Sequence, residues 1–235
     1  YCFAPSRISA GIQQRCLDLG YLLLVDWLST PAEPRRQLDE LAGRQVDAIV
    51  WLGTENDGGL PWATPDVLQG LPPVVFGMTY PQSGLHTVTI DNRQIAAGVT
   101  RHLIAQGRRC IGHISGPLNR NVPRDRLAGW QAAMAEAGLP CDDSLIVSGD
   151  WTAASGAQAY SALAAAHPEL DAIMVANDRM ALGVLSAASA TGRRVPGDLA
   201  VTGFDNIPEA AFFIPPLTTV QQPLLELGSV AADLA

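Results

Sequence analysis

The chain has 235 residues, 48% of them apolar, and a formal net charge of −8. Its length and apolar content suffice for a large core in one domain or two subdomains. The acidic balance argues against direct binding of nucleic acid by this segment. No apolar run approaches the roughly 20 residues that span a bilayer, and no signal peptide is visible at Tyr1–Arg7. These features predict a soluble, cytoplasmic α/β protein without a membrane partner.

Apolar runs typical of buried parallel strands alternate with amphipathic stretches typical of helices. The expected strands, in chain order, are Tyr21–Asp26, Val46–Leu52, Val74–Phe76, Thr87–Asp91, Cys110–Ser115, Leu145–Val147, Asp171–Ala176 and Leu199–Phe204. Glycines typical of helix C-termini follow several helical stretches, at Gly20, Gly107, Gly138 and Gly192. Thr152 is expected to cap the helix that runs to Ala166. The alternation predicts right-handed βαβ units and parallel sheets.

The strand and helix pattern runs twice, with a change near Asp91-Asn92. This repetition predicts an N-terminal subdomain made of residues 1–90 and 222–235, and a C-terminal subdomain made of residues 91–221. The segment Tyr1–Ser6 is expected to be a loop that follows a first strand lying outside this chain. After the proline-rich segment Ile214–Pro223, a final helix is expected over Leu224–Leu234.

Polar side chains follow two of the expected strands at the point where each strand ends. Asn177-Asp178 follows the run Ala172–Ala176, and Asp205-Asn206 follows Leu199–Phe204. Open α/β sheets bind their ligands at the carboxyl ends of the strands. The sequence therefore predicts a binding site for a small polar molecule at this edge.

Cysteine and histidine spacing predicts neither a metal site nor a disulfide framework. The cysteines are scattered, at Cys2, Cys16, Cys110 and Cys141. The histidines are equally far apart, at His86, His102, His113 and His167. Cys110 lies in an expected apolar strand and is interpreted as a small core residue. No cofactor, no metal and no catalytic residue is expected.

Six motifs, in this order and spacing, together resemble one family. They are Gly116-Pro-Leu118, Arg124–Trp130, Gly149–Thr152, Val175–Gly183, Val201–Asp205 and Ile214–Gln222. The chain resembles the regulatory core of the lactose-repressor (LacI/GalR) family of transcriptional regulators. The resemblance implies a periplasmic-binding-protein-like fold with two similar doubly wound subdomains and a sugar-like effector in the cleft between them. It also implies a homodimer or a tetramer, and operator DNA bound through a headpiece that these 235 residues do not include.

The family pattern places five residues of the second subdomain at effector-contacting positions: Arg126, Trp151, Asn177, Asp205 and Gln222. The guanidinium of Arg126 suits hydroxyls or a carboxylate. Asp205 can accept hydroxyl hydrogen bonds, and the ring of Trp151 can pack against the C–H face of a sugar. Alternatively, Arg126 is a surface cation, Trp151 a core residue and Asp205 a helix N-cap.

In the first subdomain the resemblance implies that Ala4, Pro5 and Ile8 approach the effector. A helix N-terminus with Ile8 in the core is an equally good interpretation of that residue. Met78 departs from the family pattern, because family members often carry an aspartate at this position. The departure removes a partner for a ligand hydroxyl and predicts a more apolar wall, which leaves the identity of the effector open.

Two other functions fit parts of the sequence. A periplasmic sugar-binding protein of a transport system would share the fold, but the missing signal peptide and Pro215–Thr219 favour the regulator. A glycosidase would need two carboxylates about 5–10 Å apart, for which Asp178 and Asp205 are candidates. Each of these carboxylates has an amide neighbour, which favours binding over catalysis, so no enzyme activity is expected.

Overall fold

The computed structural model describes residues 3–26, 34–52, 62–78 and 84–235. The chain divides into two compact units, one made of residues 1–90 and 223–235 and the other of residues 91–222. Gln222, which the sequence-based boundary assigns to the N-terminal subdomain, groups instead with the second unit. None of the helices within the described ranges is long and apolar enough to cross a membrane.

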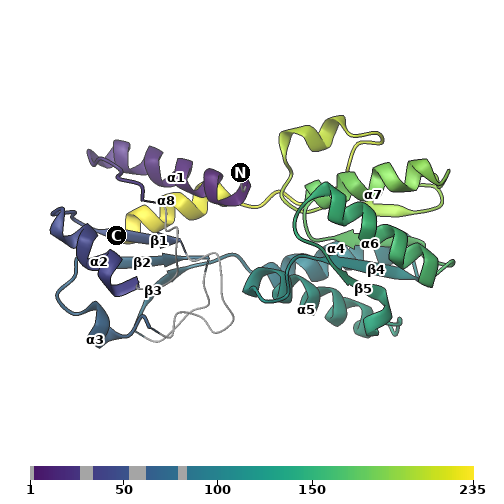
Figure 1. Cartoon of the computed structure of the whole chain (residues 1–235), viewed down its shortest axis with the longest axis horizontal. Coiled ribbons are helices and arrows are strands. Elements are labelled where there is room, and N and C mark those ends of the chain that lie inside the picture. Colours follow the sequence, from purple (N-terminus) through teal and green to yellow (C-terminus); the bar gives the residue numbers. More distant parts are fainter. Residues whose placement is uncertain (1–2, 27–33, 53–61, 79–83) are drawn as a thin grey trace. The chain divides into compact units, whose positions relative to one another are not determined.

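The first unit holds a parallel sheet with the strand order β1-β2-β3. Its strands are β1 (Ile49–Leu52), β2 (Val74–Gly77) and β3 (His86–Val88), and its helices are α1 (Phe3–Leu19), α2 (Pro34–Gly43), α3 (Pro65–Leu68) and α8 (Leu224–Leu234). The last helix returns from the far end of the sequence to pack against α1 (Figure 1). A Cβ atom at Gly11 would lie 2.1 Å from the carbonyl oxygen of Leu225, so this close helix contact requires glycine.

Two sequence-based expectations for the first unit are wrong. Phe3–Ser6 is not a loop but the first turn of α1. Tyr21–Asp26 is not a strand, although its composition is that of one, because within the described residues it pairs with no other strand. Leu22 is consequently 92% exposed, and Tyr21, Leu24 and Val25 are each at least half exposed. A strand needs a neighbour for its backbone hydrogen bonds as well as a suitable sequence.

The second unit is a parallel four-stranded sheet with the order β5-β4-β6-β7. Its strands are β4 (Ile111–Ser115), β5 (Ile146–Ser148), β6 (Ala172–Val175) and β7 (Ala200–Thr202), and its α-helices are α4 (Asn92–Ala105), α5 (Asn121–Glu136), α6 (Ala153–Ala166) and α7 (Asp178–Ala190). Two 3-10 helices, η1 (Asp143–Leu145) and η2 (Pro208–Phe212), lie in the connections. Helix α4 packs against α5, and α6 packs against α7 (Figure 1).

All residues of β4 and β6 are buried, as the uninterrupted apolar runs predict. The hydroxyl of Thr152 accepts a hydrogen bond from the backbone N–H of Ser155 at 3.2 Å and caps α6, which confirms the predicted cap. The four glycines predicted at helix C-termini have φ angles between 64° and 88°. The predicted α/β class with parallel sheets is confirmed.

Candidate functional site

Arg126 lies on the second turn of α5 with 4% of its surface exposed. Its Nε donates to Asn92 Oδ1 at 2.9 Å, and its Nη1 donates to the backbone carbonyl of Ala176, at the end of β6. Its guanidinium carbon lies 3.7 Å from the centre of the Phe204 ring. The interpretation of Arg126 as a surface cation is therefore wrong: α4, α5 and two strand ends hold it in one orientation.

Asp205 follows β7, and Gln222 donates from Nε2 to its Oδ1 at 2.6 Å. Burial raises the pKa of Asp205 to about 7, while the charge of Arg126 acts in the opposite direction. Burial likewise lowers the pKa of Arg126 to about 10, and the carboxylates of Asp205 and Asp178 partly offset that effect. A carboxyl group that titrates near neutral pH beside a buried cation is typical of a functional site.

Asn177 follows β6 and connects the end of that strand to Trp151. Its Oδ1 accepts from the backbone N–H of Met180 at 2.8 Å and caps α7, and its Nδ2 donates to the backbone carbonyl of Trp151 at 3.2 Å. The Trp151 ring lies directly over Gly116, where a Cβ atom would approach it to 2.3 Å. The sequence did not reveal this capping role of Asn177, although an amide directly before a helix is a common N-cap.

Asp178 is a structural carboxylate. Its Oδ2 accepts from the backbone N–H of Ile207 at 2.8 Å, and its Oδ1 accepts from the hydroxyl of Thr219 at 2.5 Å. Each oxygen therefore already has a protein partner that ties α7 to the segment after β7. Because both oxygens of Asp178 already accept hydrogen bonds, Asp178 is poorly suited to act with Asp205 as a pair of catalytic carboxylates in glycoside hydrolysis.

Backbone conformation also marks this edge of the sheet. Trp151, Asp205 and Asn206 have φ angles of 74°, 122° and 51°, in the left-handed region that favours glycine. Non-glycine residues in this region carry strain and concentrate at functional sites. Met78, in the first unit, shares the property with a φ of 60°.

The three predicted site residues of the first unit differ in how deeply they are buried. Ala4 and Pro5, on the first turn of α1, are half-buried. Ile8 is fully buried and packs with Ile12, Leu224 and other apolar residues of the unit. The structure thus favours the core interpretation of Ile8, while Ala4 and Pro5 retain some accessible surface.

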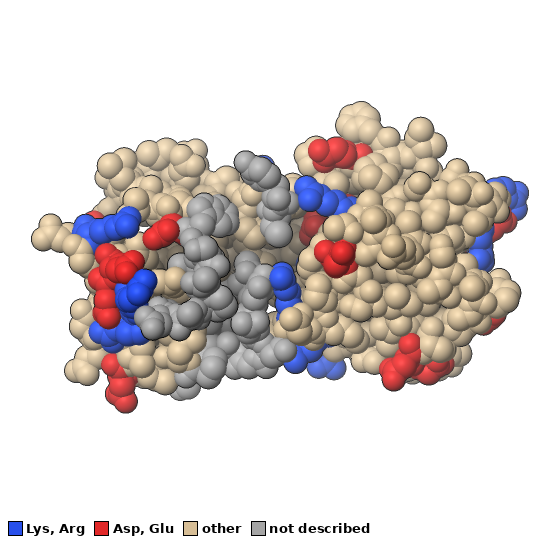
Figure 2. Space-filling model, viewed as in Figure 1, with Lys and Arg blue, Asp and Glu red and all other residues tan. Residues whose placement is uncertain are grey.

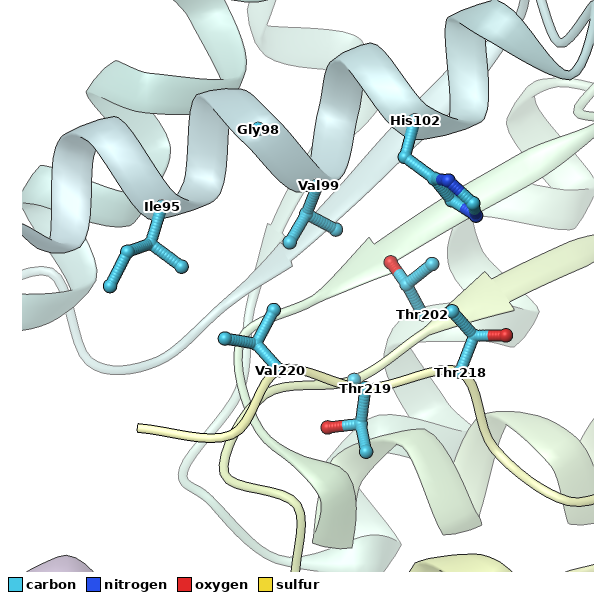
Figure 3. Close-up of a pocket in the computed structure, with 9 residues that line it drawn as sticks. Ile95, Gly98, Val99, His102, Thr202, Thr218, Thr219 and Val220 are labelled. Atoms are coloured by element: carbon cyan, nitrogen blue, oxygen red, sulfur yellow. The ribbon is translucent and has the colours of Figure 1, made fainter. Parts of the chain in front are cut away.

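A pocket of about 350 Å³ lies elsewhere in the second unit (Figure 3). It is lined by Ile95, Gly98, Val99, His102, Thr202, Gly203, Thr218, Thr219 and Val220. None of the eight predicted site residues lines it. Its lining carries hydroxyls and apolar groups but no carboxylate or guanidinium, so the charged groups at the strand ends are the better candidate site.

The face of the molecule in Figure 2 shows acidic and basic side chains interspersed on each unit, with much uncharged surface on the second. Nucleic-acid-binding surfaces carry continuous basic patches or stripes. The described surface in this view has the mixed charge of an ordinary protein surface.

Comparison with known proteins identifies the family of proteins to which this chain is related. Residues 100–235 match the family model described as a periplasmic binding protein-like domain. The chain is 35% identical over 229 residues to the HTH-type transcriptional repressor CytR of Escherichia coli K12, covering 96% of this chain and 66% of that repressor. It thus spans just under two thirds of the length of this relative.

Two further matches are also transcriptional regulators. The ribose operon repressor of Escherichia coli K12 is 34% identical over 233 residues, covering 97% of this chain and 69% of that repressor. A solved structure, the transcriptional regulator CelR in complex with cellobiose, superimposes with a TM-score of 0.85 at 33% identity, covering 97% of this chain and 70% of that one. The chain therefore belongs to the LacI family of transcriptional regulators and carries its effector-binding core. These relatives are regulators rather than transport proteins or enzymes.

Proposed function

We propose that this chain is the effector-binding core of a cytoplasmic transcriptional repressor and has no enzyme activity. The complete protein binds operator DNA as a homodimer through a headpiece outside these 235 residues. The repressors at 34–35% identity support this proposal, as does the matching core. An effector that binds one conformation more tightly than another shifts operator affinity by the same coupling free energy, typically about 1–3 kcal/mol.

The effector is a small polyhydroxylated molecule held by Arg126, Trp151, Asn177, Asp205 and Gln222, with Ala4 and Pro5 contributing from the first unit. The observation that carries this proposal is the buried guanidinium of Arg126, which reaches the end of β6, near the partly buried carboxyl group of Asp205 after β7. The guanidinium and the carboxylate supply donors and acceptors for vicinal hydroxyls. The indole of Trp151 supplies an apolar surface for a sugar ring.

A thermal-shift screen tests this proposal. Ribose and cellobiose are suitable probes, because one relative is a ribose operon repressor and one solved neighbour holds cellobiose. A ligand at 100 times its dissociation constant adds about 2.7 kcal/mol of stability. We expect at least one probe to stabilise the parent and Asp143→Asn, a variant of an exposed acid in η1, but not Asp205→Ala. Equal stabilisation of Asp205→Ala would contradict the proposed site.

We propose that the first unit forms the dimer together with its counterpart in a second copy. Closed two-fold dimers match the paired half-sites of operators. Leu225, Val230 and Leu234 on α8 are each at least 40% exposed, which gives this unit apolar surface to bury. Sedimentation of the full-length protein as a monomer at micromolar concentration would contradict this proposal.

A further inference from the structure

The opposite edge of the four-stranded sheet holds a second group of chemically reactive side chains. Within the described ranges, Cys110, His167 and Glu169 are grouped so that one potential ligand atom of each lies within 4.8 Å of the others. Cys110 directly precedes β4, and the other two lie between α6 and β6. This group is at the amino ends of the strands, whereas the effector residues follow their carboxyl ends. The sequence did not predict it because 57 residues separate Cys110 from His167.

The distances within the group suit a tetrahedral ion. Cys110 Sγ lies 3.8 Å from Glu169 Oε1, and His167 Nδ1 lies 3.2 Å from the same oxygen. Zinc bonds of about 2.3 Å to sulfur and about 2.0–2.1 Å to nitrogen or oxygen place tetrahedral ligand atoms about 3.3–3.6 Å apart. Both distances to Glu169 Oε1 lie close to that range, so the exposed Glu169 carboxylate is placed to share an ion with Cys110 and with His167.

The histidine is oriented as a metal ligand. His167 Nε2 lies 3.1 Å from the backbone carbonyl oxygen of Ser144, which can only accept a hydrogen bond. With Nε2 directed at this carbonyl, Nδ1 is the ring nitrogen that faces the Glu169 carboxylate. A carbonyl bonded to the far nitrogen is the usual outer-shell partner of a metal-binding histidine.

Asp171 fixes the backbone next to Cys110, because its two carboxylate oxygens accept from the N–H groups of Arg109 and Cys110. Burial, followed by the carboxylates of Glu169 and Asp171, raises the pKa of the Cys110 thiol to about 11, and Arg193 acts in the opposite direction. A metal ion that binds this sulfur therefore has to displace the thiol proton.

We propose that Cys110, His167 and Glu169 bind a zinc-class divalent cation, with a fourth position open to water. Sulfur and imidazole ligands select such ions over calcium and magnesium, which prefer oxygen ligands. Binding forms the metal–sulfur, metal–nitrogen and metal–oxygen bonds, and the proton of the Cys110 thiol passes to solvent. The ion joins the start of β4 to the connection between α6 and β6. His167 is 17% exposed and Glu169 is 64% exposed, so the ion can enter from solvent.

Cobalt(II) is the direct probe, because a cobalt–thiolate bond gives a charge-transfer absorption in the near ultraviolet. We expect the metal-free chain to bind one equivalent of cobalt with this absorption and zinc to displace it. Cys110→Ser abolishes the absorption, whereas the matched variant Cys141→Ser, at another half-buried free cysteine, retains it. Glu169→Gln, at an exposed position that leaves the fold intact, weakens binding about tenfold or more.

Three outcomes would overturn the proposal: no absorption in the parent at micromolar cobalt, absorption that persists in Cys110→Ser, or unchanged affinity in Glu169→Gln. A chain in which Cys2, Cys16 and Cys141 are all serine must still bind, since Cys110 then remains as the sole cysteine.

Discussion

In the four-stranded sheet, the polar side chains at the carboxyl ends of the strands (the carboxyl edge) differ in burial and hydrogen bonding from those at the amino ends (the amino edge). At the carboxyl edge Arg126 is 4% exposed and is fixed by Asn92 and Ala176, while Gln222 holds Asp205. At the amino edge Glu169 is 64% exposed, and its carboxylate lies 3.2 Å from His167 Nδ1. Hydrogen bonds therefore fix the side chains at the carboxyl edge, whereas the side chains at the amino edge are partly exposed to solvent.

This difference indicates what each edge can bind. A preorganised guanidinium and carboxylate recognise hydroxyls at low entropic cost. Preorganisation of buried charge destabilises the free protein, because each charge loses its hydration. The carboxyl edge is therefore expected to affect both the stability and the pH response of the second unit.

The largest expected effect is on Arg126. Arg126→Met leaves the Asn92 and Ala176 oxygens without their donor and Asp205 without its cation, and removes the contact with Phe204. Breaking such a buried pair costs about 3–5 kcal/mol of unfolding free energy. Urea denaturation measures this loss. Arg101→Met, which breaks an exposed ion pair with Glu136, is the control and must lose much less; equal losses would contradict the structural role of Arg126.

The second prediction concerns the pH dependence of the unfolding free energy, to which His113 and Asp205 contribute with opposite signs. Burial lowers the pKa of His113 from 6.5 to about 4, so its stabilising contribution is complete above pH 6.5 and is lost as the pH falls toward 4. Burial raises the pKa of Asp205 from 3.8 to about 7, so the folded state takes up this proton first and gains stability as the pH falls from 7 toward 4. Each effect amounts to about 2 kcal/mol between pH 7.5 and 5.

Asp205→Asn removes one of these titrations. We expect the variant to lose about 2 kcal/mol of unfolding free energy between pH 7.5 and 5, because His113 is then unopposed. The parent loses less than half as much. Urea denaturation at both pH values gives the comparison, and a parent that loses as much as the variant would show that Asp205 does not titrate near neutral pH.

The third prediction concerns effector affinity. Because burial raises the pKa of Asp205 to about 7, its ionised fraction rises about tenfold between pH 6 and 8. The carboxylate accepts the effector hydroxyls, so affinity for the probe found by thermal shift rises by about the same factor, or about 1.4 kcal/mol. Calorimetry at both pH values measures it. Asp205→Asn must show no such rise, and a parent whose affinity is independent of pH would contradict the proposed contact.

Much of the second unit was predictable from sequence. Its uninterrupted apolar runs, such as Ile111–Ser115, predicted buried parallel strands because local composition alone sets that pattern. The polar residues after β6 and β7 were identified for the same reason. Composition predicted the strand Tyr21–Asp26 equally strongly, but strand formation also depends on a neighbour that local sequence does not specify.

Side-chain roles were less predictable, because they depend on contacts between distant residues. Arg126 meets Asn92 and Ala176 across 34 and 50 residues, so its burial has no local signal. Asp178 follows a strand and has an asparagine neighbour, as Asp205 does, yet both oxygens of Asp178 bond to the protein. The one local signal overlooked was the amide of Asn177 directly before a helix, which is typical of a cap.

The most direct test of the proposed effector site is calorimetry of the identified probe with the parent, Asp205→Ala and the control Asp143→Ala. Removing the Asp205 carboxylate leaves ligand hydroxyls unpaired, which costs about 1–3 kcal/mol, or roughly tenfold to a hundredfold in affinity. We predict this loss for Asp205→Ala and parent-like affinity for Asp143→Ala. Parent-like affinity in Asp205→Ala would show that the effector binds elsewhere.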